Sequence, residues 1–181
     1  MTDFLSSDAG RCAIIAKQFL EGALTLDATQ RDIGPVLFRP TLALAGQGLE
    51  LFLKACWHLN GKKPPTSGKA GHDVVGLWND EVCKPAQDHV FSNANRVTAE
   101  VRASGTQSEL PDQDGIQPLI VEYVFALGKL HGEYPYPLRY PSAEDKMAPR
   151  TPFLVKTLWG ASDDLLKRPE DFMLTNHRGE D

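Results

Sequence analysis

The apolar positions along this chain recur at helical spacing, and strand-like alternation of apolar and polar residues is scarce. The clearest case is TLALAGQGLELFLKACWHLNG at 41–61. Its apolar residues recur every three or four positions, which places them on one face of a helix. Gly61 is a typical residue to follow the C-terminus of a helix. We therefore predict a helix over this segment and an all-α fold.

The same spacing predicts five further helices. They cover about 8–26, 73–78, 85–101, 117–131 and 152–166. Asp8 and Asp73 are suitable N-caps, and Pro85 suits the first turn of its helix. The whole chain, 1–181, is predicted to be one domain, an up-and-down bundle of five or six helices with its core at about 8–168.

The segments between these helices are polar or rich in proline. KKPPTSGKAG at 62–71 is a basic loop, and residues 104–118 form a polar connection long enough to suggest a mobile or functional loop. YPYPLRYP at 134–141 is predicted to be non-helical, because its prolines favour extended backbone. The acidic tail at 171–181 is predicted to be frayed.

Composition narrows the class of protein. A chain of 181 residues suits one domain with its own core. The net charge of −5 argues against a dedicated binder of duplex DNA but allows a local basic patch. Its three cysteines form no CxxC pair, so neither a zinc knuckle nor a disulfide framework is predicted. Without a long apolar run or signal-peptide features, we expect a cytoplasmic protein that does not contact a membrane.

Familiar catalytic and nucleotide-binding motifs are incomplete. SGK at 67–69 lacks the earlier glycine of a P-loop, and Ala70 stands where its hydroxyl residue belongs. GQG at 46–48 lacks the third glycine of a dinucleotide motif, and close helix packing explains its small residues better. Neither HExxH nor GxSxG occurs. We therefore predict no metal site and no cofactor, and the catalytic residues stay unknown.

Polar residues share one face of the helix at 41–61. Gln47, Glu50, Lys54 and His58 fall within an arc of about 80°, opposite the apolar face. One interpretation is an ordinary solvent face with a Glu50–Lys54 pair one turn apart. The alternative is that these side chains belong to a binding site.

The loop after this helix concentrates positive charge on an acidic chain. Lys62, Lys63 and Lys69 precede His72, and such an asymmetry attracts phosphate. The alternative is a mobile basic loop without a ligand. Asp73 is explained as a helix N-cap. His72 beside it either bonds a backbone carbonyl or contributes to a ligand site.

The segment YPYPLRYP combines aromatic rings, proline and one arginine. Rings on a stiff backbone stack on nucleic-acid bases, as we expect of Tyr140, and Arg139 suits a phosphate group. The alternative is a proline-rich strap that packs its tyrosines across the bundle.

The motifs ALAGQGLELFLKACWHLNGKKPP, GHDVVGLW and LRYP, in this order, resemble the HEPN superfamily of prokaryotic helical domains. The resemblance covers about 41–141 and rests on E-x3-K, a glycine-ended loop, a GHDL-like helix start and RYP. Val74 stands where leucine is usual. The resemblance implies a bundle of four or five helices, often a homodimer. It also implies RNA cleavage or nucleotide binding in defence, toxin–antitoxin or stress systems.

One departure from the family bears on catalysis. Catalytic members carry an arginine followed four to six residues later by histidine, a spacing that no arginine of this chain has. The usual metal-independent ribonuclease chemistry is therefore not expected, and whether the protein is an enzyme stays open. An alternative pair from distant segments is His72 with Arg139. The candidate ligand-binding residues are Glu50, Lys54, Lys69, His72, Arg139 and Tyr140.

Three functional hypotheses follow. The first is a catalytically diverged HEPN-like domain that binds a nucleotide or RNA, with Lys54, His72 and Arg139 converging on one cleft. The second is a non-enzymatic module that dimerises or binds a partner protein such as a toxin or enzyme. The third is a ribonuclease with a non-standard site. The identity of the ligand and the partner, and the oligomeric state, do not follow from the residues.

Overall fold

The computed structural model describes residues 4–105, 110–140 and 148–174, except the side chains of Arg31 and Lys69. All regular secondary structure in these ranges is helical, so the predicted all-α bundle is confirmed. The long helices are α1 (Asp8–Ile33), α2 (Phe38–Leu59), α5 (Lys84–Ala103), α6 (Gln113–Gly132) and α7 (Thr151–Lys167). The shorter elements are α3 (Gly68–Gly71), α4 (Val74–Asn79) and four 3-10 turns at Phe4–Ser6, Pro35–Leu37, Glu81–Cys83 and Pro169–Phe172.

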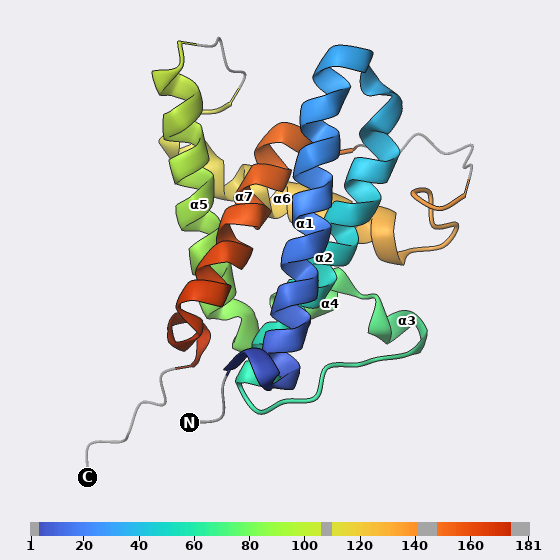
Figure 1. Cartoon of the computed structure of the whole chain (residues 1–181), viewed down its shortest axis with the longest axis vertical. Coiled ribbons are helices and arrows are strands. Elements are labelled where there is room, and N and C mark those ends of the chain that lie inside the picture. The colour runs from blue at the N-terminus through green and yellow to red at the C-terminus, as the bar shows by residue number, and fades with distance from the viewer. Residues whose placement is uncertain (1–3, 106–109, 141–147, 175–181) are drawn as a thin grey trace.

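Helices α1 and α2 form an antiparallel hairpin, α7 packs beside α1, and α5 packs beside α7. Helix α6 crosses behind this layer in Figure 1, in contact with α2, α4 and α5. The core lies where the apolar faces of these helices meet. Leu49 and Leu53 of α2 and Ile120 of α6 are fully buried there. The crossing of α6 brings its C-terminal end beside α2 and α4.

Three predicted helix boundaries are confirmed. Gly61 follows α2 with a positive φ of 71°, a backbone conformation that glycine adopts without strain. Asp73 caps α4, since its carboxylate accepts from the backbone N–H of Gly76 at 2.8 Å. Pro85 lies in the first turn of α5. Local signals therefore determine these ends.

The predicted start of the first helix at residue 8 is confirmed, but its predicted cap and its predicted end are wrong. The N-cap of α1 is Ser7 rather than Asp8, because the Ser7 hydroxyl accepts from the backbone N–H of Gly10 at 3.0 Å. The helix continues past Leu26 to Ile33. A buried hydrogen bond supports this extension, since Asp27 accepts from the Thr151 hydroxyl of α7 at 2.5 Å.

Helix α6 begins earlier than predicted, so the expected loop at 104–118 is shorter. The helix starts at Gln113, and Pro118 lies inside it. Burial explains the difference, because Ile116 is completely buried and anchors the extra turn in the core. Residues 106–109 of the predicted loop lie outside the described residues.

The prediction of a frayed tail from residue 171 is wrong for its first residues. Phe172 is completely buried and lies edge-on to Phe52, with ring centroids 5.9 Å apart. Asn60 at the end of α2 holds this turn, since its amide donates to the Phe172 carbonyl at 3.0 Å and its oxygen accepts from Leu174. The remainder of the tail, 175–181, lies outside the described residues.

Helix α2 is the central helix of the bundle. By length and composition, Pro35–Leu59 would also suffice to cross a membrane, but half of its most apolar window is buried inside the protein. Such burial is typical of a core helix. Its polar residues Glu50 and Lys54 are buried as well, and they form part of the candidate site.

Candidate functional site

Glu50 and Lys54 form a buried ion pair on α2. Their residues are 2% and 9% exposed, so the interpretation as a solvent face is wrong. The Lys54 ammonium donates to Glu50 Oε1 at 2.6 Å and to the carbonyl oxygen of Gly71 at 2.7 Å. The chain between α2 and α4 therefore covers this part of α2, which the helical pattern alone does not reveal.

Two histidines bind the other oxygen of the same carboxylate. His72 Nδ1 and His131 Nε2 each lie 2.9 Å from Glu50 Oε2. His72 comes from the turn before α4, and His131 comes from the last turn of α6. The His72 ring therefore bonds the Glu50 carboxylate, and the alternative of a bond to a backbone carbonyl is wrong. Together with Lys54 we call these residues the Glu50 cluster.

Local packing explains why α6 delivers His131 to this place. His131 continues the buried register of Ile120, Val124 and Leu127 along α6, so its ring points into the bundle. A Cβ atom at Gly46 of α2 would lie only 2.8 Å from His131 Nδ1. Glycine at position 46 therefore makes room for the ring, which confirms close helix packing as the explanation of the GQG stretch.

A second glycine brings α6 against the turn that carries His72. A Cβ atom at Gly132 would lie 2.3 Å from the backbone oxygen of His72. Any larger residue would push the end of α6 away from the turn before α4. This contact fixes the position of the C-terminal end of α6, and therefore the position of the segment from Tyr134 to Tyr140 that follows it.

The Glu50 carboxylate is stabilised in its charged form. Burial by itself raises the pKa of Glu50, but hydrogen bonds from His131, Lys54 and His72 outweigh it and lower the pKa to about 2. A charged carboxylate accepts a hydrogen bond from each imidazole. The proton of neutral His72 then lies on Nδ1, and its Nε2 has no hydrogen-bond partner among the described residues.

The two histidines differ in their access to solvent. The side chain of His131 is 4% exposed, whereas that of His72 is 42% exposed. Their rings lie edge to face, with centroids 6.3 Å apart. His72 is thus the one member of the Glu50 cluster with a large solvent-exposed surface, held at its inner edge by a buried group.

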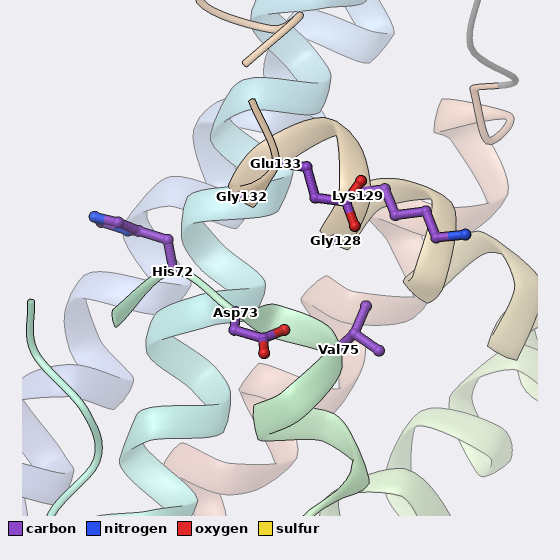
Figure 2. A pocket seen from close by; sticks show the side chains of 7 residues that line it. All are labelled: His72, Asp73, Val75, Gly128, Lys129, Gly132 and Glu133. Atoms are coloured by element: carbon purple, nitrogen blue, oxygen red, sulfur yellow. The ribbon is translucent and has the colours of Figure 1, made fainter. Parts of the chain in front are cut away.

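A notch of about 200 Å³ adjoins this cluster, between the start of α4 and the end of α6. Its lining residues are His72, Asp73, Val75, Gly128, Lys129, Gly132 and Glu133. Figure 2 shows that the His72 ring turns away from the Asp73 and Val75 side chains.

The segment from Tyr134 to Tyr140 is non-helical, as predicted, and displays its aromatic residues. Tyr134 and Tyr140 are 85% and 61% exposed, so the interpretation as a strap that packs its tyrosines on the bundle is wrong for both. The Tyr136 ring lies edge-on to the Tyr134 ring. The Arg139 guanidinium lies over the Tyr136 ring, 5.7 Å from its centre. Pro141 lies outside the described residues.

The structure brings some candidate residues together and leaves others apart. Glu50, Lys54 and His72 share one cluster. Arg139 is exposed and stacks on Tyr136, and no described contact joins it to the Glu50 cluster. Tyr140 follows it at the surface. The predicted convergence is thus seen for Lys54 and His72 and not for Arg139.

The basic loop is partly engaged with the rest of the protein. The Lys62 ammonium lies 3.3 Å from the Asp80 carboxylate and 5.6 Å from the centre of the Trp57 ring. Lys63 is exposed. Lys69 lies in α3, but its side chain is outside the described part of the chain. Lys62 and Lys63 are thus both exposed, and Lys62 has an ion-pair partner in Asp80.

Comparison with known proteins gives no match. No family model, no curated protein and no solved structure matches this chain. The geometry of the site therefore carries the functional argument.

The residue that sequence reasoning missed is His131. It stands 81 positions from Glu50, and no short motif links the two. The available signal was its place in the apolar register of α6, where a polar residue in a buried position needs a partner.

Proposed function

We propose that this protein is a HEPN-like, catalytically diverged domain that binds a ribonucleotide or single-stranded RNA. The ligand lies across the exposed edge of His72 and the segment from Tyr134 to Tyr140. The observation that carries the proposal is the fixed imidazole of His72, which is exposed on one edge and bound by a buried carboxylate on the other.

His72 presents an acceptor to the solvent. With the Nδ1 proton directed at Glu50, the neutral ring carries a lone pair on Nε2. A ribose 2′-hydroxyl donates to such an acceptor, and this hydroxyl is the group by which proteins tell RNA from DNA. The ring cannot swing freely, because Glu50 is held in turn by Lys54 and His131. A ribose is therefore a better match than a deoxyribose.

The neighbouring aromatic segment supplies the second part of the ligand site. It begins two residues after Gly132, whose Cα lies against the His72 backbone. Exposed tyrosine rings stack on bases with little sequence preference, at about 1–3 kcal/mol per base. Arg139 is exposed in the same segment and suits a phosphate group. These features favour a single-stranded ligand over a duplex, whose bases are already stacked.

The resemblance to the HEPN superfamily supports the same proposal. Two of the four features that carry it, the E-x3-K element and the GHDL-like helix start, meet in the Glu50 cluster through Glu50, Lys54 and His72. A role in a prokaryotic defence, toxin–antitoxin or stress system, a cytoplasmic location and a homodimeric state stay predictions from the sequence. So does the hypothesis of a module that binds a partner protein.

Binding to matched oligonucleotides tests the proposal. Fluorescence anisotropy is measured with a labelled single-stranded RNA and the DNA of the same sequence, in chelator and at two salt concentrations. We expect tighter binding to RNA, and weaker binding at the higher salt because phosphate contacts release counterions. His72→Ala should remove the preference for RNA, and Tyr140→Ala should lower the affinity for both RNA and DNA.

His58→Ala is the matched control, since His58 lies on the same helix as Glu50 but outside the cluster. It should bind RNA as the unchanged protein does. The proposal is wrong if the unchanged protein binds neither oligonucleotide. It is also wrong if RNA and DNA bind equally and His72→Ala leaves both affinities unchanged.

The contact between His72 and Glu50 also favours a second function, RNA cleavage at a non-standard site. An imidazole oriented by a carboxylate is a typical general base. Nε2 would take the proton of a 2′-hydroxyl, the 2′-oxygen would attack the adjacent phosphorus, and the 5′-oxygen would leave with a proton from water. The products would carry a 2′,3′-cyclic phosphate and a 5′-hydroxyl. Products of this kind, absent with His72→Ala, would support cleavage; intact RNA after long incubation would exclude it.

A further inference from the structure

The Glu50 cluster contains three potential metal ligands from three separate segments. Glu50, His72 and His131 each offer one ligand atom, and these three atoms lie within 4.8 Å of one another. Glu50 and His131 are almost completely buried, so this group differs from the exposed acidic clusters that are common on protein surfaces. Each imidazole directs one nitrogen at the same carboxylate oxygen.

We propose that Glu50, His72 and His131 bind a divalent transition-metal ion of the zinc type. Two imidazole nitrogens and one carboxylate oxygen form a donor set that zinc accepts in proteins, with a fourth position left open. The proposal goes beyond RNA binding and does not depend on it.

The distances in the cluster are close to those that a metal requires. With metal–ligand bonds of about 2.0–2.1 Å and tetrahedral angles, ligand atoms stand about 3.3 Å apart. The two nitrogen–oxygen separations are 2.9 Å. Opening each by roughly 0.4 Å would admit the ion. His72 sits on a turn at the surface, so its ring adjusts without moving the core, whereas the buried His131 stays in place.

Neighbouring groups fix the carboxylate and limit its mode of binding. Lys54 holds Glu50 Oε1 at 2.6 Å and is itself held by the carbonyl of Gly71. Oε1 is therefore occupied, and Glu50 would bind the ion through Oε2 alone. Such outer contacts orient ligands in metal sites. The Lys54 ammonium also repels the ion, so the site favours an anion, hydroxide or a phosphate oxygen, at the open position.

Metal binding would change what His72 offers to a ligand. With the ion on Nδ1, the proton of the neutral ring moves to Nε2, which turns the exposed acceptor into a donor. His72 is the member of the cluster that reaches solvent, so a ligand from solution would approach the ion from that side. A metal-loaded protein is therefore expected to bind phosphate groups more tightly than the metal-free protein.

Metal titration of untagged protein tests this inference. After treatment with chelator and its removal, Zn²⁺ is titrated against a chromophoric competitor, and Co²⁺ is added separately to record its visible spectrum. We expect one ion per chain and the intense absorption of four-coordinate Co²⁺. Both signals should be lost in His72→Ala, whose exposed side chain can be removed without opening the core. They should also be lost in His131→Asn, and they should persist in His58→Ala.

The inference is overturned if the unchanged protein binds less than a tenth of an equivalent, or if His72→Ala and His131→Asn both keep the ion. Circular dichroism of each variant shows whether it is folded. If His131→Asn is unfolded, the metal binding of His72→Ala alone tests the inference. The two proposals fail separately. RNA binding in chelator without metal binding contradicts the metal site, and metal binding without RNA binding contradicts the proposed function.

Discussion

Replacing Glu50 by glutamine should destabilise the fold strongly, although the two side chains have the same shape. The amide has one acceptor oxygen, whereas the carboxylate accepts from Lys54 on one side and from two imidazoles on the other. If the amide NH₂ group faces Lys54, it meets a donor; if it faces the two imidazoles, each ring must move its proton to its other nitrogen to accept from it. The variant also leaves the buried Lys54 charge without its counterion.

The magnitude follows from the burial of the pair. Removing one partner of a buried ion pair costs about 3–5 kcal/mol, because an uncompensated charge stays in the interior. For a chain of this length, 1 kcal/mol corresponds to roughly 2–4 °C in the melting temperature. Glu50→Gln should therefore melt roughly 6–20 °C below the unchanged protein.

Glu100→Gln is the matched control for this experiment. Glu100 also contacts two cations, Arg96 and Lys156, each at 2.6 Å, but its side chain is 42% exposed. Exposed pairs contribute about 0–1 kcal/mol. Urea unfolding followed by circular dichroism, which suits a helical protein, measures both variants. If Glu50→Gln loses no more stability than Glu100→Gln, the argument about the buried cluster is refuted.

Three further predictions concern packing and pH. Phe172→Ala should lower the free energy of unfolding in urea by about 3–5 kcal/mol, because the ring of Phe172 is completely buried. Met173 is 50% exposed, so Met173→Ala should lower it little. Gly46→Ala should cost about 1–3 kcal/mol, because the new Cβ would meet a buried imidazole at 2.8 Å. Burial raises the pKa of Asp164, but hydrogen bonds, first from Asn93, lower it overall. Its contribution to stability is therefore present above the ordinary Asp pKa of about 3.9 and is lost as the pH falls through the lowered value of the folded state, so the difference between Asp164→Asn and the unchanged protein should shrink at acid pH.

Controls and contrary outcomes are direct. Gly22→Ala is the control for Gly46→Ala, since its Cβ would meet only the flexible end of Leu44 at 3.2 Å, and a helical alanine is favourable. Equal stability of the two alanine variants would contradict the tight contact at Gly46. A difference between Asp164→Asn and the unchanged protein that stays constant as the pH falls below about 3.9 would contradict the charged role of Asp164. Full stability of Phe172→Ala would contradict the burial of the C-terminal turn.

The parts of the fold that follow from sequence are those with local causes. The positive φ of Gly61 and the cap at Asp73 depend on neighbouring residues, and both were predictable. The start of α6 depends on the burial of Ile116 in the core, and the persistence of α1 to Ile33 depends on contacts that α7 provides. Tertiary contacts determine these two helix limits, and the periodicity of apolar residues in the sequence does not predict such contacts.

The candidate site shows the same division. The pairing of Glu50 with Lys54 follows from their spacing of one helical turn. Their burial does not, because the covering segment has no regular pattern. His131 reaches the carboxylate through the crossing of α6 behind α2, which is a property of the whole fold (Figure 1). Sequence reasoning therefore identified three of the four members of the cluster, and packing supplied His131.

The central claim is that the Glu50 cluster holds His72 as a ligand-binding imidazole. Nitrogen-15 spectra of the histidine side chains, recorded in chelator with and without single-stranded RNA, test it most directly. The account predicts that His72 carries its proton on Nδ1 and that the Nε2 signal moves when RNA is added, and moves less with matched DNA. A His72 ring protonated on Nε2 in the free protein, or an Nε2 signal that RNA leaves unchanged at saturation, would contradict it.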